Sequence, residues 1–160
     1  MKALSLTQPW ASLVAIGAKQ WETRSWSTSY RGQLAIHASK GYPKICRELE
    51  YEEPFMSALK RGLTAPSALP LGAIIALGTL IDCQPTSRFR EIGDAGFAVP
   101  SQYIEVDADE LDFGDYYTGR YAFRLENVVA LPNPIPCKGA LGFWTVPADV
   151  IVQIRRLESE

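Results

Sequence analysis

The sequence has few of the residues that bind metals or form disulfide frameworks. Among 160 residues it contains three cysteines, Cys46, Cys83 and Cys137, and a single histidine, His37. The cysteines are odd in number, widely separated and free of any Cys-x-x-Cys spacing, which argues against a disulfide framework or a zinc site. One histidine also excludes a multi-histidine metal site. We therefore expect no metal, no cofactor and a reducing, cytoplasmic environment.

Long apolar runs and an excess of basic residues are also missing. No run approaches the roughly 20 apolar residues that cross a bilayer, and the stretch from Met1 to Leu6 lacks the apolar core of a signal peptide. The formal net charge is −2 and the pI is about 5.5, which is unsuited to coating nucleic acid by bulk electrostatics. We expect no membrane association, a monomer or weak homodimer, and only local contacts with any nucleic acid.

The composition is that of an ordinary globular protein. Hydrophobic residues make up 47% of the chain and charged residues 21%, far from the composition of disordered chains. A chain of 160 residues has the usual size of one domain, and no Pro/Ser-rich linker divides it. We therefore expect residues 1–160 to form a single domain with one core.

Short apolar patterns predict several strands with helices at the margins. Alternating or continuous apolar residues indicate strands near residues 4–6, 21–26, 33–37, 72–81, 120–126 and 138–146. Proline and glycine signals bound the helices, which we expect from Pro9 to Gly17, in two pieces between Pro43 and Arg61 that Pro54 separates, and after Pro147. The stretch 83–119 is less regular. This order predicts an α+β fold, a small mixed β-barrel of five to six strands with flanking helices.

The most informative stretch runs from Gly17 to Trp26, where a helix stop is followed by Lys19, Glu22 and Arg24. In an extended segment the period of two places Glu22 and Arg24 on one face, and a turn after Gly17 could bring Lys19 toward them. Such a group can hold an anionic or amide-bearing ligand, and a lysine whose pKa is lowered can act as a base or nucleophile. A solvated charge cluster at a helix exit is the alternative that the residues leave open.

Other candidate ligand contacts are aromatic or polar side chains, namely Trp10, Trp26, His37, Ser39, Lys40, Tyr116 and Arg120. A tryptophan ring can stack on a base where its face is exposed, although core packing is the more frequent role. His37 lies on the strand face opposite Leu34 and Ile36. The alternative to a catalytic role is that this histidine is simply hydrogen-bonded within the strand. An ordinary turn is the alternative for Tyr116 and Arg120.

At these residues the sequence resembles the ASCH family (activating-signal-cointegrator homology domains), a group of PUA-like RNA-binding barrels. The family's Gly-x-Lys-x-x-Glu-x-Arg signature stands intact at Gly17, Lys19, Glu22 and Arg24. Further matching segments are Gln8-Pro9-Trp10-Ala11, Trp26, Arg31-Gly32, Ile36-His37-Ala38, Glu110, Phe113-Gly114-Asp115, Gly119-Arg120, Pro134-Ile135-Pro136, Lys138-Gly139 and Gly142-Phe143-Trp144. The resemblance covers nearly the whole chain. It implies a PUA-like barrel with a cleft beside the signature, where members are thought to recognise RNA or nucleosides.

The resemblance leaves three functions open. The first is recognition of RNA or a modified nucleoside, with ligand contacts from Gln8, Trp10, Arg24, Trp26, Arg31, His37, Ser39, Lys40, Asp115, Tyr116 and Arg120. The second is an amidohydrolase that deacylates cytidines acylated on the exocyclic amine, in which Lys19 activates water and Glu22 or Glu110 moves a proton. Deacylating members have a hydroxyl residue where this chain has Glu22. The third is a ribonuclease that uses the same cleft. We favour recognition and leave catalysis open.

Overall fold

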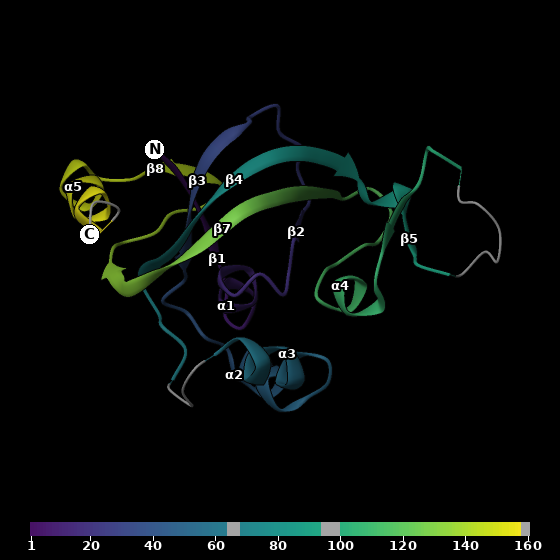
Figure 1. Ribbon diagram of the computed structural model, residues 1–160, viewed down its shortest axis with the longest axis horizontal. Coiled ribbons are helices and arrows are strands. Elements are labelled where there is room, and N and C mark those ends of the chain that lie inside the picture. Colours follow the sequence, from purple (N-terminus) through teal and green to yellow (C-terminus); the bar gives the residue numbers. More distant parts are fainter. Residues whose placement is uncertain (64–67, 94–99, 158–160) are drawn as a thin grey trace.

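A curled sheet of six strands dominates the computed structural model, which describes residues 1–63, 68–93 and 100–157. The strand order across the sheet is β2-β7-β4-β3-β1-β8. Its strands are β1 (Lys2–Leu6), β2 (Trp21–Arg24), β3 (Gly32–Ala38), β4 (Ala73–Pro85), β7 (Tyr121–Pro136) and β8 (Phe143–Thr145). β1 and β3 are parallel, and the other neighbouring strands are antiparallel. The sheet forms a half-barrel (Figure 1), which confirms the predicted mixed α+β fold.

Short helices flank the sheet, together with a small second sheet. The helices are α1 (Trp10–Ala15), α2 (Lys44–Glu48), the 3-10 turn η1 (Leu49–Tyr51), α3 (Phe55–Gly62), the 3-10 turn η2 (Thr86–Arg88), α4 (Ala108–Asp112) and α5 (Ala148–Leu157). The second sheet pairs β5 (Phe89–Glu91) with β6 (Ile104–Val106). Figure 1 shows the large sheet arching over α1, with α5 at one end and α4 beside β5 at the other. Within the described ranges, no helix is long and apolar enough to cross a membrane.

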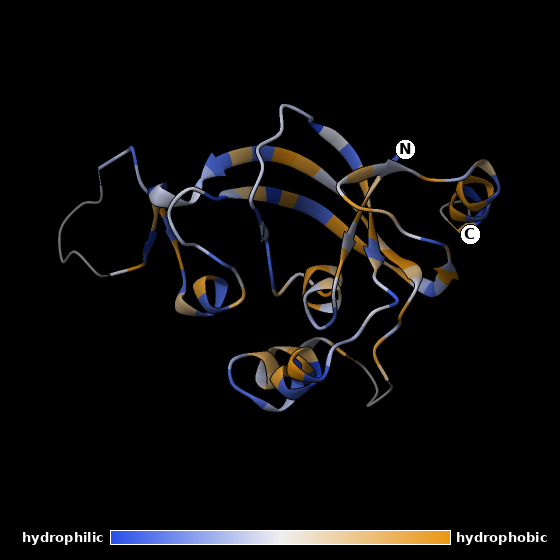
Figure 2. Ribbon diagram, turned by 180° about the vertical axis from the view of Figure 1, so that it is seen from behind, coloured by the Kyte–Doolittle hydropathy of each residue, from blue (hydrophilic) through white to orange (hydrophobic). Residues whose placement is uncertain are grey.

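Side chains of alternating direction fill a core on each face of the sheet. One core packs the sheet on α1 and includes Leu4, Leu6, Ala11, Val14, Leu34 and Ile36. The other packs it on α5 and includes Ala3, Ala35, Val150 and Ile154. Figure 2 shows apolar residues, in orange, along the strands of the large sheet and in α1. Because the strand period is two, Ser5 and His37 share the face of Ala3 and Ala35, and the β1–β3 register pairs them directly.

The ends of three predicted strands are wrong. The strand predicted over 72–81 continues to Pro85. The strand predicted to end near residue 126 continues to Pro136. On the edge of β7 that faces away from β4, β2 pairs only with residues 121–124. The remainder of this edge has no strand partner within the described part of the chain. Pro132 and Pro134, which lack an N–H, are tolerated on such an edge. The last strand, predicted over 138–146, spans only Phe143–Thr145.

The predicted helices are present, and the stretch 83–119 holds elements that the apolar pattern did not reveal. The two pieces separated at Pro54 are α2 with η1, and α3. α1 begins at Trp10, one residue after Pro9. In the irregular stretch, Asp107 caps α4 by accepting a hydrogen bond from the Glu110 backbone N–H at 2.8 Å. The Asp-x-x-Glu spacing of these two residues is a capping signature from which this helix could have been predicted.

Candidate functional site

The three charged residues of the signature form one connected ion cluster. The Lys19 Nζ atom lies 3.8 Å from Glu22 Oε2, and Arg24 Nε donates a hydrogen bond of 3.0 Å to Glu22 Oε1. Glu22 and Arg24 share one face of β2, as the period of two predicts. The left-handed backbone of Gly17, with φ of 76°, ends the helix just before Lys19. The signature is therefore a folded cluster and not a set of solvated charges.

Lys19 lies inside the protein, with a relative exposure of 1%. Its Nζ atom donates a hydrogen bond of 2.5 Å to the Trp21 carbonyl. Burial lowers the pKa of Lys19, the carboxylates of Glu22 and Glu110 oppose this shift, and Arg24 adds to it. The ammonium group thus has little contact with solvent, and it pairs with the Oε2 atom of Glu22.

Glu110 links α4 to the beginning of β2. Its Oε2 accepts a hydrogen bond from the Gln20 N–H at 2.9 Å, and its Oε1 accepts one from the Trp21 N–H at 3.0 Å. Burial raises the pKa of Glu110, while Lys19 and these two backbone bonds oppose the shift. Both carboxylate oxygens are therefore used in holding the backbone that carries Lys19 and Glu22.

Arg24 connects the ion cluster to a large cleft. Its Nη2 donates a hydrogen bond of 2.8 Å to the Ser5 carbonyl, and its side chain lines a cleft of about 1160 Å³. The lining residues are Ser5, Thr7, Arg24, His37, Ser39, Lys40, Leu71, Gly72, Cys137, Lys138, Gly139, Ala140, Leu141 and Gly142. Of these described residues, three are cationic and none is acidic, although the whole chain has a net charge of −2.

A hydrogen-bonded chain of side chains includes two residues that line this cleft, Ser5 and His37. His37 Nε2 lies 2.9 Å from the Cys137 carbonyl, which can only accept, so this nitrogen carries the proton. The other ring nitrogen, Nδ1, then accepts from the Ser5 hydroxyl at 3.0 Å, and the Ser5 oxygen accepts from Trp144 Nε1 at 3.1 Å. Burial lowers the pKa of His37, which favours the neutral ring that this pattern requires. The network ties the segment 137–142 to β1 and β3.

Gly139 packs directly against this network. A Cβ atom at this position would lie 2.4 Å from His37 Cε1 and 2.6 Å from Ser5 Oγ. Such contacts are shorter than packed side chains allow, so the close approach of the segment to His37 requires glycine.

Several predicted ligand contacts lie outside this cleft and have structural partners. Gln8 is fully buried: its Nε2 donates to the Pro70 carbonyl and its Oε1 accepts from the Ser12 N–H. Trp26 packs edge-on against Phe123 and Phe143. The Arg31 guanidinium donates to the carbonyls of Thr28 and Tyr30 and lies 3.5 Å from Asp82.

A smaller hollow of about 220 Å³ contains other predicted residues. It is lined by Trp10, Glu22, Thr23, Asp112, Phe113, Gly114 and Asp115. Asp115 pairs with Arg120 at 3.2 Å. The Tyr116 hydroxyl is buried without a hydrogen-bond partner in the described residues, and burial raises the pKa of Tyr116. Within the same residues, no group of three His, Cys, Asp or Glu side chains is placed to hold a metal ion.

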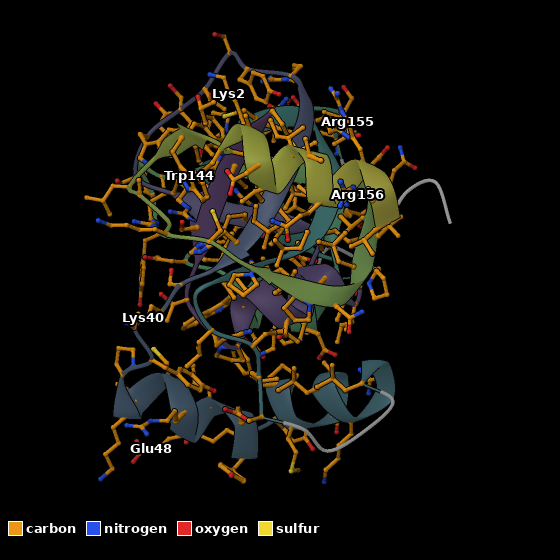
Figure 3. The ribbon with its side chains drawn as sticks, turned by 90° about the vertical axis from the view of Figure 1, so that its left-hand side faces the viewer. Lys2, Lys40, Glu48, Trp144, Arg155 and Arg156 are labelled. Atoms are coloured by element: carbon orange, nitrogen blue, oxygen red, sulfur yellow. The ribbon has the colours of Figure 1, made fainter. Side chains whose placement is uncertain are left out.

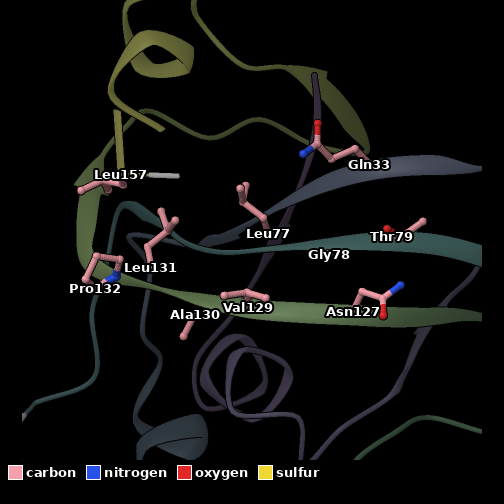
Figure 4. A pocket seen from close by; sticks show the side chains of 10 residues that line it. All are labelled: Gln33, Leu77, Gly78, Thr79, Asn127, Val129, Ala130, Leu131, Pro132 and Leu157. Atoms are coloured by element: carbon pink, nitrogen blue, oxygen red, sulfur yellow. The ribbon is translucent and has the colours of Figure 1, made fainter. Parts of the chain in front are cut away.

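A third hollow lies between β4, β7 and the end of α5, and Figure 4 shows the side chains around it. Its volume is about 360 Å³, and Leu77, Val129, Leu131 and Leu157 contribute its apolar lining. It contains no residue of the signature.

The structure thus brings Arg24, His37, Ser39 and Lys40 into one cleft and places Glu22 in the lining of the smaller hollow. Sequence reasoning missed the other ten lining residues, among them Ser5, Thr7, Leu71, Lys138 and Leu141. For Lys138 a signal was available, because Lys138-Gly139 belongs to the segments that match the family. The others are ordinary residues whose position depends on strand register and loop path.

Comparison with known proteins identifies the family. A family model of the ASCH domain matches residues 4–132. The chain is 35% identical over 147 residues to the proteins named Activating signal cointegrator 1 of Homo sapiens and of Mus musculus. These matches cover 92% of this chain and 22% of each relative, so the chain spans less than a quarter of the length of the curated relatives it matches.

Solved structures give the same answer for the fold. The crystal structure of ASCH from Zymomonas mobilis has a TM-score of 0.52 and 14% identity, over 98% of this chain and 94% of that one. A point mutant of the Zymomonas mobilis protein gives a TM-score of 0.52 and 12% identity, over 98% and 96%. At such identities the likeness concerns the fold alone, while the family match rests on the sequence. The chain is a member of the ASCH domain family.

Proposed function

We propose that this ASCH domain binds RNA or a modified nucleoside in the cleft lined by Arg24, Lys40 and Lys138. The observation that carries the proposal is the contrast in charge between the cleft and the chain: the described residues that line the cleft include three cations and no acid, while the chain as a whole carries −2. Cationic side chains provide the affinity for nucleic-acid phosphates. A local basic cleft on an acidic protein favours a short single-stranded ligand over coating of a long duplex.

Arg24 is suited to hold a phosphate because its guanidinium is fixed before the ligand arrives. Glu22 accepts from Nε and the Ser5 carbonyl accepts from Nη2. A guanidinium has five N–H donors, so these two bonds fix its plane while Nη1 is left to face a ligand. A side chain that is already ordered loses less conformational entropy on binding.

In this proposal Lys19 and Glu110 act through other residues. Lys19 forms an ion pair with the Oε2 atom of Glu22, and Glu110 accepts hydrogen bonds from the backbone at the beginning of β2. The amidohydrolase alternative requires the Lys19 amine to reach the water molecule that attacks the substrate. Its lowered pKa would suit that role, but its exposure of 1% supports the positioning role.

The proposal is tested by fluorescence anisotropy with a labelled single-stranded oligouridylate. The wild-type protein should bind with an affinity that falls with salt, and three phosphate contacts predict a log–log slope of about −2. Lys138→Ala and Lys40→Ala should each weaken binding and reduce the magnitude of the slope by about 0.7. Arg156→Ala removes the same charge from α5 (Figure 3), outside the cleft lining, and should change neither quantity.

Two outcomes would overturn the proposal. One is binding that is absent or independent of salt. The other is binding that Arg156→Ala weakens as much as Lys138→Ala does. Incubation with acylated cytidines tests the alternative: release of free cytidine that is lost in Lys19→Met would favour the amidohydrolase.

A further inference from the structure

The described lining of the cleft offers no large aromatic ring to a bound base. Among the described residues that line it there is no Trp, Tyr or Phe. The rings expected to stack on a base are engaged elsewhere: Trp10 packs edge-on against Phe55, Trp26 packs against Phe123, and the Tyr116 hydroxyl is buried. A base that enters this cleft must therefore find its apolar contact on aliphatic side chains.

Two leucines lie at the edge of the cleft and are open to solvent. Leu141 has a relative exposure of 98% and Leu71 one of 43%, and both line the cleft. Their backbone segments are neighbours, because the Cys137 N–H donates a hydrogen bond of 3.0 Å to the Gly72 carbonyl. Isolated exposed leucines need no explanation, but two of them beside a basic cleft form an apolar surface next to a charged one.

The segment that carries Leu141 is held at both ends. At one end His37 Nε2 donates to the Cys137 carbonyl, and at the other Trp144 Nε1 donates to Ser5 Oγ. Between them, Gly139 packs against the His37 ring, and Gly142 turns the chain with φ of 63°. The segment also carries Lys138. The same anchored loop therefore carries both Lys138, a cation that can bind phosphate, and the apolar side chain of Leu141.

We propose that Leu141 and Leu71 contact the face of an unpaired nucleobase whose phosphate lies at the cationic side chains of the cleft. This inference rests on the proposed function and specifies its ligand class: single-stranded RNA with at least one base turned out of the stack. Bases in a duplex are covered on both faces by their neighbours, so they cannot reach these leucines. Apolar side chains contact flipped bases in other proteins. Because every base has an apolar face, this contact tolerates different sequences.

The test combines one change in the protein with one change in the ligand. The probes are a labelled oligouridylate and an oligomer of the same length in which every base is absent but every phosphate is kept. Wild-type protein should bind the abasic oligomer at least fivefold more weakly. Leu141→Ala should weaken binding of the oligouridylate about fivefold and binding of the abasic oligomer less than twofold, with the salt slope unchanged. Leu71→Ala should act in the same direction.

Val129→Ala is the matched control, because Val129 has a relative exposure of 66% and lines the separate apolar hollow of Figure 4. It should leave binding of both probes unchanged. Equal affinity of the wild type for the two probes, or equal weakening of both by Leu141→Ala, overturns the base contact and leaves the proposed function standing. Failure of the wild type to bind either probe overturns both. Tighter binding of acylated than of plain cytidine, lost in Leu141→Ala, would assign the leucines to an acyl group and would also overturn the base contact.

Discussion

Glu22 and Arg24 lie two positions apart on β2, and the Glu22 carboxylate accepts the Arg24 Nε–H at 3.0 Å while its other oxygen faces the buried Lys19 ammonium. The carboxylate is thus shared between a buried cation and a cation that lines the cleft. This arrangement gives the signature a physical role: the buried Lys19 positions the Glu22 carboxylate, and that carboxylate positions the Arg24 guanidinium.

Glu22→Gln should destabilise the protein and weaken ligand binding together. The substitution leaves the Lys19 ammonium buried without its nearest carboxylate, and breaking a buried ion pair typically costs about 3 kcal/mol of unfolding free energy. Urea unfolding measures this loss. Glu126→Gln is the control, because Glu126 forms a more exposed pair with Arg124 on β7, and such pairs contribute at most about 1 kcal/mol. Equal effects of the two substitutions would contradict the role given to Glu22.

Gly139→Ala should disturb the lining of the cleft around His37. Its methyl group would overlap His37 and Ser5, so the segment 137–142 must shift, at a cost of about 1–3 kcal/mol. We expect weaker binding of oligouridylate in anisotropy and a lower urea midpoint. Gly41→Ala is the control, because a Cβ at Gly41 meets no atom within 4 Å. If Gly139→Ala binds and unfolds as the wild type does, the close packing against His37 has no consequence.

His37 should make the protein less stable in mild acid. Its pKa in the folded state is lowered from 6.5 by burial, so below pH 6.5 the unfolded chain takes up a proton that the folded chain does not. The unfolding free energy therefore falls as the pH drops from 6.5 through the lowered pKa. Urea unfolding at a series of pH values should show this fall in the wild type, and the His37→Gln variant should lack this component. A parallel pH dependence in both proteins would contradict it.

Glu110→Ala should loosen the beginning of β2. It leaves the N–H groups of Gln20 and Trp21 without their carboxylate acceptor. The Trp21 residue is buried, and an unsatisfied buried donor costs about 1–3 kcal/mol. Hydrogen exchange of these two amides should become faster than in the wild type. Asp109→Ala, which removes only an exposed carboxylate 3.9 Å from Arg61, should leave their exchange unchanged. Unaltered protection in Glu110→Ala would contradict the link.

Local patterns predicted the strands of the large sheet and the helices outside the stretch 83–119, because these depend on neighbours in sequence. They also indicated that the charged residues of the signature could meet. Glu22 and Arg24 share a face through the strand period alone, and the apolar run near residues 72–81 indicated the inner strand β4. The cleft depends instead on contacts between distant segments. Ser5 meets a residue 32 positions away through the parallel β1–β3 register, and His37 meets a carbonyl 100 positions away. No local pattern specifies such contacts.

The aromatic candidates illustrate the same limit. An exposed ring that stacks on a base and a ring packed in a core have the same local sequence, so Trp26 could be assigned only after its contacts with Phe123 and Phe143 were seen. Conversely, Leu141 carried no functional signal in the sequence, because leucine is usually a core residue. Its exposure in the folded chain makes it a candidate contact.

The most direct test of the central claim is a crystal structure of the protein with a bound short oligouridylate. We predict a phosphate oxygen within hydrogen-bonding distance of Arg24 Nη1 and a base face against Leu141. An oligonucleotide bound in the hollow beside Trp10 and Asp115, or in the apolar hollow of Figure 4, with the basic cleft empty, would contradict the account.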